Sequence, residues 1–199
     1  MLTIPHPVTL EGDRVRLIPL EPTHLEALYE IAQDEEIWRY YPFNGADKKI
    51  FLQQYATILL EKQAGLRYPF VVIDKANGKM IGSTGFLHIS KEHNNLEIGT
   101  TWYDRNYWSK GYNEECKLLL LQYCFETLYL NRVSLSTLDI NKRSQKAITR
   151  IGAQFEGINR NKVIRSGIVR NVVVFSFIPE DWPQAKQTLN NLISERKLL

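Results

Sequence analysis

The alternation of apolar and polar residues predicts a series of β-strands. In residues 14–20, Val15 and Leu17 alternate with Arg14 and Arg16, which is typical of a strand with one buried face. Asn77-Gly78 is a strong hairpin-turn signal between two further apolar runs. The other strands are expected at 68–74, 79–90, 96–103, 132–138, 155–164 and 169–178, the last two forming a hairpin around Ser166-Gly167.

Apolar residues at helical spacing, with their start and stop signals, predict the helices. Thr23 and Glu26 form a capping-box pattern for a helix ending near residue 33. Residues 113–128 are apolar around most of the helix, so this helix is expected to be buried on more than one side. Gly152 is a natural C-cap for a short helix at 143–151. Further helices are expected at 47–63 and, as a C-terminal helix, at about 181–197.

The length and composition indicate one domain and exclude several classes of protein. A chain of 199 residues without a linker or repeat suits a single mixed α+β domain over residues 1–199. The 25 basic and 22 acidic residues give a net charge of only +3, so nucleic acid is not expected as a partner. No apolar run approaches the ~20 residues of a membrane helix, and residues 1–9 do not resemble a signal peptide. No membrane association is therefore expected.

The cysteines and histidines give no sign of a disulfide or a metal site. Cys116 and Cys124 lie on one predicted helix, about 12 Å apart along its axis, which is too far for a disulfide. Both are expected in the core, and a cytoplasmic location fits them. The histidines show no metal-ligand spacing, so no metal is expected. The motifs of Ser-His-Asp hydrolases and P-loop proteins are absent.

The segment 107–114 (Tyr-Trp-Ser-Lys-Gly-Tyr-Asn-Glu) is the best candidate for a binding loop. It connects a predicted strand to the start of a predicted helix, where backbone N–H groups and the helix dipole attract anions. Gly111 lets the backbone approach a phosphate, and Lys110 adds a positive charge. An ordinary turn relieved by a glycine explains the segment equally well when it is taken alone.

The loop Trp108-Ser109-Lys110-Gly111-Tyr112-Asn113 resembles the cofactor loop of the GCN5-related N-acetyltransferases (GNAT), in particular their RimJ/RimL branch. The resemblance implies a mixed, mostly antiparallel central sheet flanked by helices, with acetyl-CoA as co-substrate. It also implies that the loop holds the pyrophosphate and that the preceding strand pairs with pantetheine. The residues so assigned are Thr101, Trp102, Tyr103, Ser109, Lys110, Gly111, Tyr112, Asn113 and Glu114.

Asn141-Lys142-Arg143-Ser144 resembles the second motif of the family, Asn-x-x-Ser. The resemblance implies that Asn141 contacts the pantetheine arm and that Ser144 is the general acid for the leaving thiolate. A simple N-cap explains Asn141 as well, and both roles can hold. Ile148 stands where members of the family often have a tyrosine acid, and Ser136 stands where some have a strand glutamate.

Glu97 is the candidate general base. Strand alternation places it on the face opposite to Leu96 and Ile98, and a carboxylate in a partly dry cleft can accept the proton of an attacking amine. A solvent-facing glutamate on an edge strand is the alternative. The aromatic residues Trp38, Tyr40 and Tyr41 fall where this family builds its acceptor pocket, although such residues commonly pack a core.

These features predict an enzyme that transfers acetyl directly from acetyl-CoA to a primary amine. The acceptor is either a protein N-terminus or a small-molecule amine. No activated nucleophile is evident, so no acyl-enzyme intermediate is expected. The alternative is a non-catalytic module of the same fold that senses acetyl-CoA. The C-terminal helix could also close a homodimer.

Overall fold

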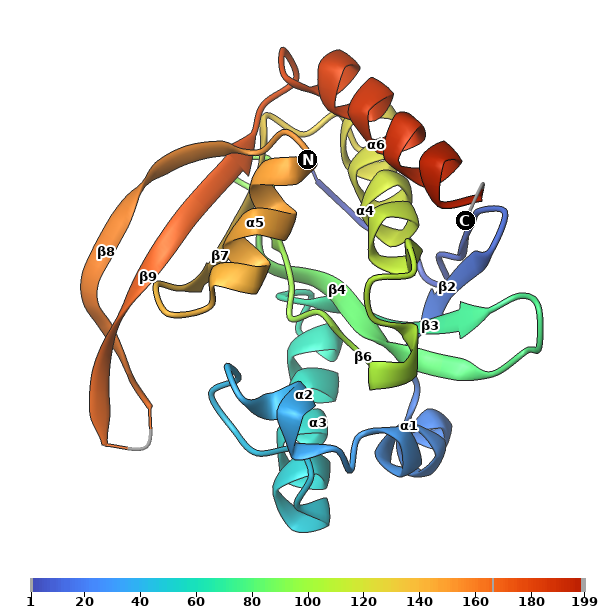
Figure 1. Ribbon diagram of the computed structural model, residues 1–199, viewed down its shortest axis with the longest axis vertical. Helices are drawn as coiled ribbons and strands as arrows, with labels where there is room; N and C mark the ends of the chain where they lie inside the picture. Colours follow the sequence, from blue (N-terminus) through green and yellow to red (C-terminus); the bar gives the residue numbers. More distant parts are fainter. Residues whose placement is uncertain (1, 166, 198–199) are drawn as a thin grey trace.

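The computed structural model describes residues 2–165 and 167–197, which form a nine-stranded sheet (Figure 1). The strand order is β1-β2-β3-β4-β5-β7-β9-β8, and the short β6 pairs with β4. Among the described strands, only β5 and β7 pair in parallel. The strands are β1 (Leu10–Glu11), β2 (Val15–Pro19), β3 (Tyr68–Asp74), β4 (Met80–Ser90), β5 (Asn95–Ile98), β6 (Trp102–Tyr103), β7 (Arg132–Leu138), β8 (Gln154–Arg165) and β9 (Ile168–Phe177). The predicted fold class is confirmed.

Helices cover both faces of this sheet. Figure 1 shows α1, α2 and α3 on one side and α4, α5 and α6 on the other. A π-helical turn (Tyr123–Thr127) extends α4, so its helical stretch reaches nearly the predicted end at 128. The α-helices are α1 (Leu25–Ile31), α2 (Glu35–Trp38), α3 (Lys48–Gln63), α4 (Tyr112–Gln122), α5 (Lys142–Arg150) and α6 (Trp182–Lys197). Among the described helices, none is long and apolar enough to cross a membrane.

The central strand β3 supplies side chains to two separate cores. Phe70 and Val72 belong to the core beneath α4 and α6, whereas Val71 and Ile73 belong to the core around α1 and α3. Successive residues of a strand point to opposite faces of the sheet. The uninterrupted apolar run of β3 therefore follows from the helical layers on both sides.

Several local predictions are confirmed. Gly78 turns between β3 and β4 with a φ of 72°, and Gly152 follows α5 with a φ of 95°. The terminal helix α6 buries Trp182 and Leu192. The hairpin of β8 and β9 pairs as expected, although Ser166 in its turn lies outside the described residues.

The predicted start of the first helix is wrong. Glu21 and His24 form the capping box, and the Glu21 N–H donates to His24 Nδ1 at 3.1 Å. A 3₁₀ turn (Pro22–His24) then leads into α1. Proline is favoured in the first turn of a helix, where its missing N–H has no partner to lose. The helical segment therefore begins with a 3₁₀ turn at Pro22 and becomes α-helical at Leu25, and Thr23 is not its cap.

The single strand predicted at 96–103 is broken into β5 and β6. β5 ends at Ile98, and its parallel pairing with β7 ends at Glu97, opposite Ser134. β7 continues to Leu138 and pairs there only with β9. The two strands therefore diverge, and the alternating pattern of the sequence gave no sign of where their pairing stops.

Candidate active site

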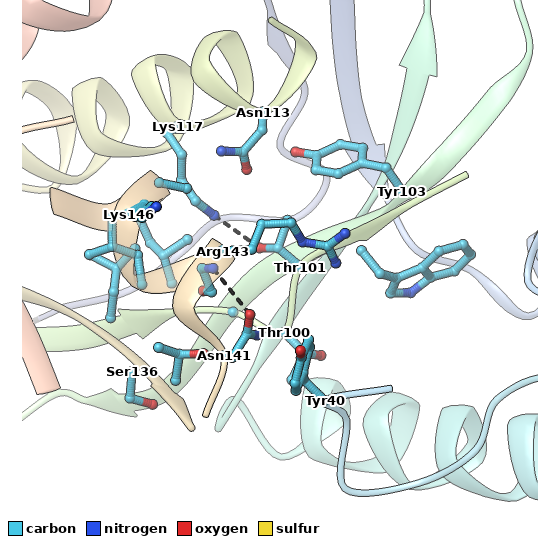
Figure 2. Close-up of a pocket in the computed structure, with 18 of the residues that line it drawn as sticks. Tyr40, Thr100, Thr101, Tyr103, Asn113, Lys117, Ser136, Asn141, Arg143 and Lys146 are labelled. Carbon is cyan, nitrogen blue, oxygen red and sulfur yellow. Dashed lines mark hydrogen bonds between the residues drawn. The ribbon is translucent and has the colours of Figure 1, made fainter. Parts of the chain in front are cut away.

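A cavity of about 610 Å³ opens where β5 and β7 diverge. Figure 2 shows its side chains converging from segments far apart in the sequence. The cavity has the size of a small-molecule site. Most of the predicted site residues line it: Tyr40, Tyr41, Glu97, Thr101, Trp102, Tyr103, Ser109, Gly111, Asn113, Glu114, Asn141 and Ser144.

One end of the cavity is the loop that begins α4. Gly111 is the N-cap of this helix and has a φ of 87°, a conformation that favours glycine. Arg14 Nη1 donates to the carbonyl of Lys110 at 2.9 Å, which ties the loop to the strand β2 region. The first N–H groups of α4 lie at the end of the helix that attracts anions.

The side chains of this loop do not all face the cavity. Ser109, Asn113 and Glu114 line it, whereas Lys110 and Tyr112 line a second hollow on the protein surface. Tyr112 also packs against the guanidinium of Arg14, which lies 4.2 Å from the ring centroid. Lys110 and Tyr112 could therefore contact a cofactor in the cavity only through their main-chain groups.

Replacing Gly111 with alanine is expected to lower both the stability and the affinity for coenzyme A. The added Cβ would lie 3.2 Å from atoms of Arg14 and Arg196, and the left-handed conformation costs an alanine about 1 kcal/mol. Urea unfolding and calorimetry measure the two effects.

Gly78→Ala is the matched control, because Gly78 has a φ of 72° and open space around it. It carries the same backbone strain far from the cavity, so we expect it to lose stability and keep its coenzyme A affinity. Equal affinities in the two variants would contradict a role for the Gly111 turn in binding.

The main-chain groups of Thr101 and Tyr103 point away from β4. The Asp104 N–H donates to the carbonyl of Ile81 in β4 at 2.8 Å, and alternate residues of a strand bond to opposite edges. Trp102 therefore faces β4, and its indole N–H donates to Tyr55 Oη at 2.8 Å in the core. Of the three predicted strand contacts, Thr101 and Tyr103 have an edge that could pair with pantetheine, and Trp102 does not.

Two side chains already occupy carbonyl oxygens on that edge. The Tyr41 hydroxyl donates to the carbonyl of Thr101. The Trp108 indole N–H donates to the carbonyl of Tyr103 at 3.0 Å. The edge would therefore pair with an extended ligand through the main-chain N–H groups of Thr101 and Tyr103.

Glu97 lines the cavity beside Ser136, on a side away from Asn113 (Figure 2). Leu96 and Ile98 are buried on the opposite face, as the alternation predicted. Ser136 Oγ donates to Glu97 Oε1 at 2.5 Å, and His88 Nδ1 lies 3.2 Å from Glu97 Oε2. The Glu97 side chain is 18% exposed and that of His88 is 75% exposed, so His88 connects the carboxylate to solvent.

Asn141 and Ser144 are both a helix cap and part of the cavity wall. Asn141 is the N-cap of α5, and its Oδ1 accepts the N–H of Ser144 at 3.1 Å. Both residues line the cavity, so the capping role does not remove them from it. Arg143, which the sequence analysis did not single out, lies between them, and its guanidinium stacks 3.8 Å from the ring centroid of Trp108.

Trp38 does not belong to the predicted acceptor pocket. It is 1% exposed, and its indole N–H donates to the carbonyl of Ala32 at 2.6 Å. Its ring packs against Phe51 and Trp102. Tyr40 and Tyr41 line the cavity. Trp38 is the last residue of α2, and the helix directs its side chain into the core. The residues that follow the helix run along the cavity.

Lys117 is the functional candidate that the sequence analysis missed. It lies on α4, is 5% exposed and lines the cavity. Its Nζ donates to Thr101 Oγ1 at 2.9 Å (Figure 2). Burial lowers the pKa of Lys117 from 10.5 to about 8. One signal was available: Lys117 lies one helical turn beyond Asn113 and therefore on the same face.

Replacing Lys117 with methionine is expected to stabilise the protein by about 2–3 kcal/mol below pH 8, because the desolvation cost of the ammonium is removed. The wild-type penalty is constant while lysine is charged in both the folded and the unfolded state. Between pH 8 and 10.5 only the unfolded state holds the proton, so wild-type stability rises and the advantage of the variant disappears. Urea unfolding at pH 7 and pH 10 measures this; an equal advantage at both would contradict it.

Comparison with known proteins assigns the family. Residues 14–154 match the family described as the acetyltransferase (GNAT) domain. The chain belongs to the GNAT acetyltransferases. The resemblance carried by the loop at Trp108–Asn113 is therefore confirmed.

Individual relatives of this GNAT protein agree with the assignment. It is 30% identical over 180 residues to "Uncharacterized N-acetyltransferase p20" of Bacillus licheniformis, with 87% of this chain and 98% of the relative covered. It is 27% identical over 187 residues to "Putative ribosomal N-acetyltransferase YdaF" of Bacillus subtilis, with 88% and 97% covered. These N-acetyltransferase relatives support an enzyme and give no support to a non-catalytic sensor.

The fold also matches that of a solved RimJ structure. The crystal structure of Mycobacterium smegmatis RimJ in complex with CoA-disulfide matches with a TM-score of 0.80 at 19% identity, covering 94% of this chain and 95% of that one. This GNAT chain offers a fitting site for such a cofactor: a glycine turn at a helix start, a strand edge turned away from β4 and a cavity between two diverging strands. The chemistry that acetyl-CoA would supply is an activated acyl thioester.

Proposed function

We propose that this GNAT enzyme uses acetyl-CoA to acetylate the N-terminal amine of a protein or peptide. The observation that carries the proposal is that Gly111, Glu97, Asn141 and Ser144 all line one and the same cavity. The name of the relative YdaF supports a protein acceptor.

In this proposal the loop 109–114 binds the pyrophosphate through main-chain N–H groups. The edge formed by Thr101 and Tyr103, with Asn141, orients the pantetheine arm. Extended main-chain pairing of this kind is an ordinary way of holding a flexible ligand. The arm would then direct the thioester toward the gap between β5 and β7, close to the strand that carries Glu97.

Glu97 would accept the proton of the attacking amine. Ser136 fixes one carboxylate oxygen through its hydroxyl, and His88 lies beside the other and reaches solvent. This arrangement lets the proton leave through His88. Ser144 would donate a proton to the departing thiolate. The cysteines Cys116 and Cys124 are fully buried, which supports direct transfer without an acyl-enzyme.

The proposal is tested by following thiol release from acetyl-CoA with a panel of acceptors. The panel contains peptides with free N-termini, the same peptides with blocked N-termini, and small amines such as amino acids and polyamines. We expect turnover with the free peptides and none with the blocked ones. Binding of acetyl-CoA in a calorimeter without turnover on any amine would instead support the sensor.

A further inference from the structure

Lys117 is a buried cation, and the contacts within the free protein do not fully compensate the desolvation cost of its charge. Within the described part of the chain its one hydrogen bond is to Thr101 Oγ1, and no carboxylate forms an ion pair with it. The hydroxyl of Thr101 is itself shared with Thr84 Oγ1 at 2.8 Å. An ammonium has three donors, so Lys117 can still donate to a ligand in the cavity.

The position of Lys117 identifies which part of a ligand it meets. Its Cα lies six residues beyond Gly111, or about 9 Å along the helix axis. The bond to Thr101 Oγ1 directs its Nζ toward the segment between β5 and β6 (Figure 2). An extended pantetheine arm would pass along that segment. The acceptors available on that arm are amide carbonyl oxygens.

We propose that Lys117 is a side-chain donor to a carbonyl oxygen of the pantetheine arm of coenzyme A. This inference rests on the proposed use of a coenzyme A thioester. It adds a side-chain grip to a part of the ligand that the strand edge would otherwise hold through main-chain groups alone. The desolvation of Lys117 is then recovered in the complex, so the residue costs stability in the free protein and contributes affinity in the bound one.

Calorimetry with two ligands tests this inference. Coenzyme A contains the pantetheine arm, whereas adenosine 3′-phosphate 5′-diphosphate keeps the phosphates and lacks the arm. We expect Lys117→Met to weaken coenzyme A binding about tenfold or more, the usual scale for a charged hydrogen bond. Its affinity for the truncated ligand should stay within about twofold of wild type. Lys49→Met, at an exposed position on α3, is the matched control and should change neither affinity.

Unchanged coenzyme A affinity in Lys117→Met overturns the inference. So does an equal loss for both ligands, since Lys117 would then act through the loop. In either case, tight binding of coenzyme A by the wild type leaves the proposed function intact. A wild type that binds neither ligand would contradict both this inference and the proposed function.

Discussion

Glu97→Gln is expected to lower kcat by about 10²–10⁴-fold, the usual contribution of a general base. Glutamine keeps the shape of the side chain and can still bond to Ser136, but it cannot accept a proton at neutral pH. The affinity for acetyl-CoA should change little, because Glu97 bonds to Ser136, which lies away from Asn113 and the start of α4 (Figure 2). Steady-state kinetics with a peptide acceptor and calorimetry with acetyl-CoA measure the two quantities separately.

Glu92→Gln is the matched control for this substitution. Glu92 is exposed in the turn between β4 and β5, five residues before Glu97, so its replacement removes the same charge without touching the cavity. We expect it to keep wild-type kcat. If Glu97→Gln also turned over at the wild-type rate, Glu97 would have no part in proton transfer, and water would take the role.

Trp38→Ala is expected to destabilise the protein by about 3–5 kcal/mol, as large-to-small substitutions of buried tryptophan do. The indole is almost completely buried, bonds to the carbonyl of Ala32 and packs against several other rings. The Trp38 ring also packs directly against Gly45, where a Cβ would lie 2.5 Å from the ring. The free energy of unfolding in urea measures the effect.

Tyr40→Ala separates the core from the cavity in the same segment. Tyr40 is half-buried and lines the cavity, so its removal should cost about 1 kcal/mol or less in stability and should raise the KM for the amine acceptor. A Trp38→Ala variant that kept its stability but lost acceptor binding would show that Trp38 belongs to the acceptor pocket after all.

Predictions from sequence succeeded where the signal is local. The limits of β3 and β7 match the predicted ranges, and the C-cap at Gly152 and the turn at Gly78 form as expected. Such features depend on the apolar pattern of one segment and on the few residues that accept a left-handed conformation. They failed where two signals compete within a few residues, as at the start of α1.

The position of the loop before α4 could also be predicted, because a glycine between a strand and a helix fixes where the first N–H groups of the helix are exposed. Which side chains of that loop reach the cavity could not. Lys110 and Tyr112 face a different hollow because Arg14, about a hundred residues earlier in the chain, holds the turn and packs on the ring. Contacts between segments so distant leave no trace in the local pattern.

The sequence by itself determined the elements, the resemblance to the GNAT family and the residue types available for acid–base chemistry. Tertiary structure alone decided that β5 and β7 part after Glu97, that Trp38 is core and that Lys117 is buried beside Thr101. The physical reason is that periodicity records which face of a segment avoids water. It does not record which neighbour covers that face, and the opening between diverging strands exists only once the neighbours are in place.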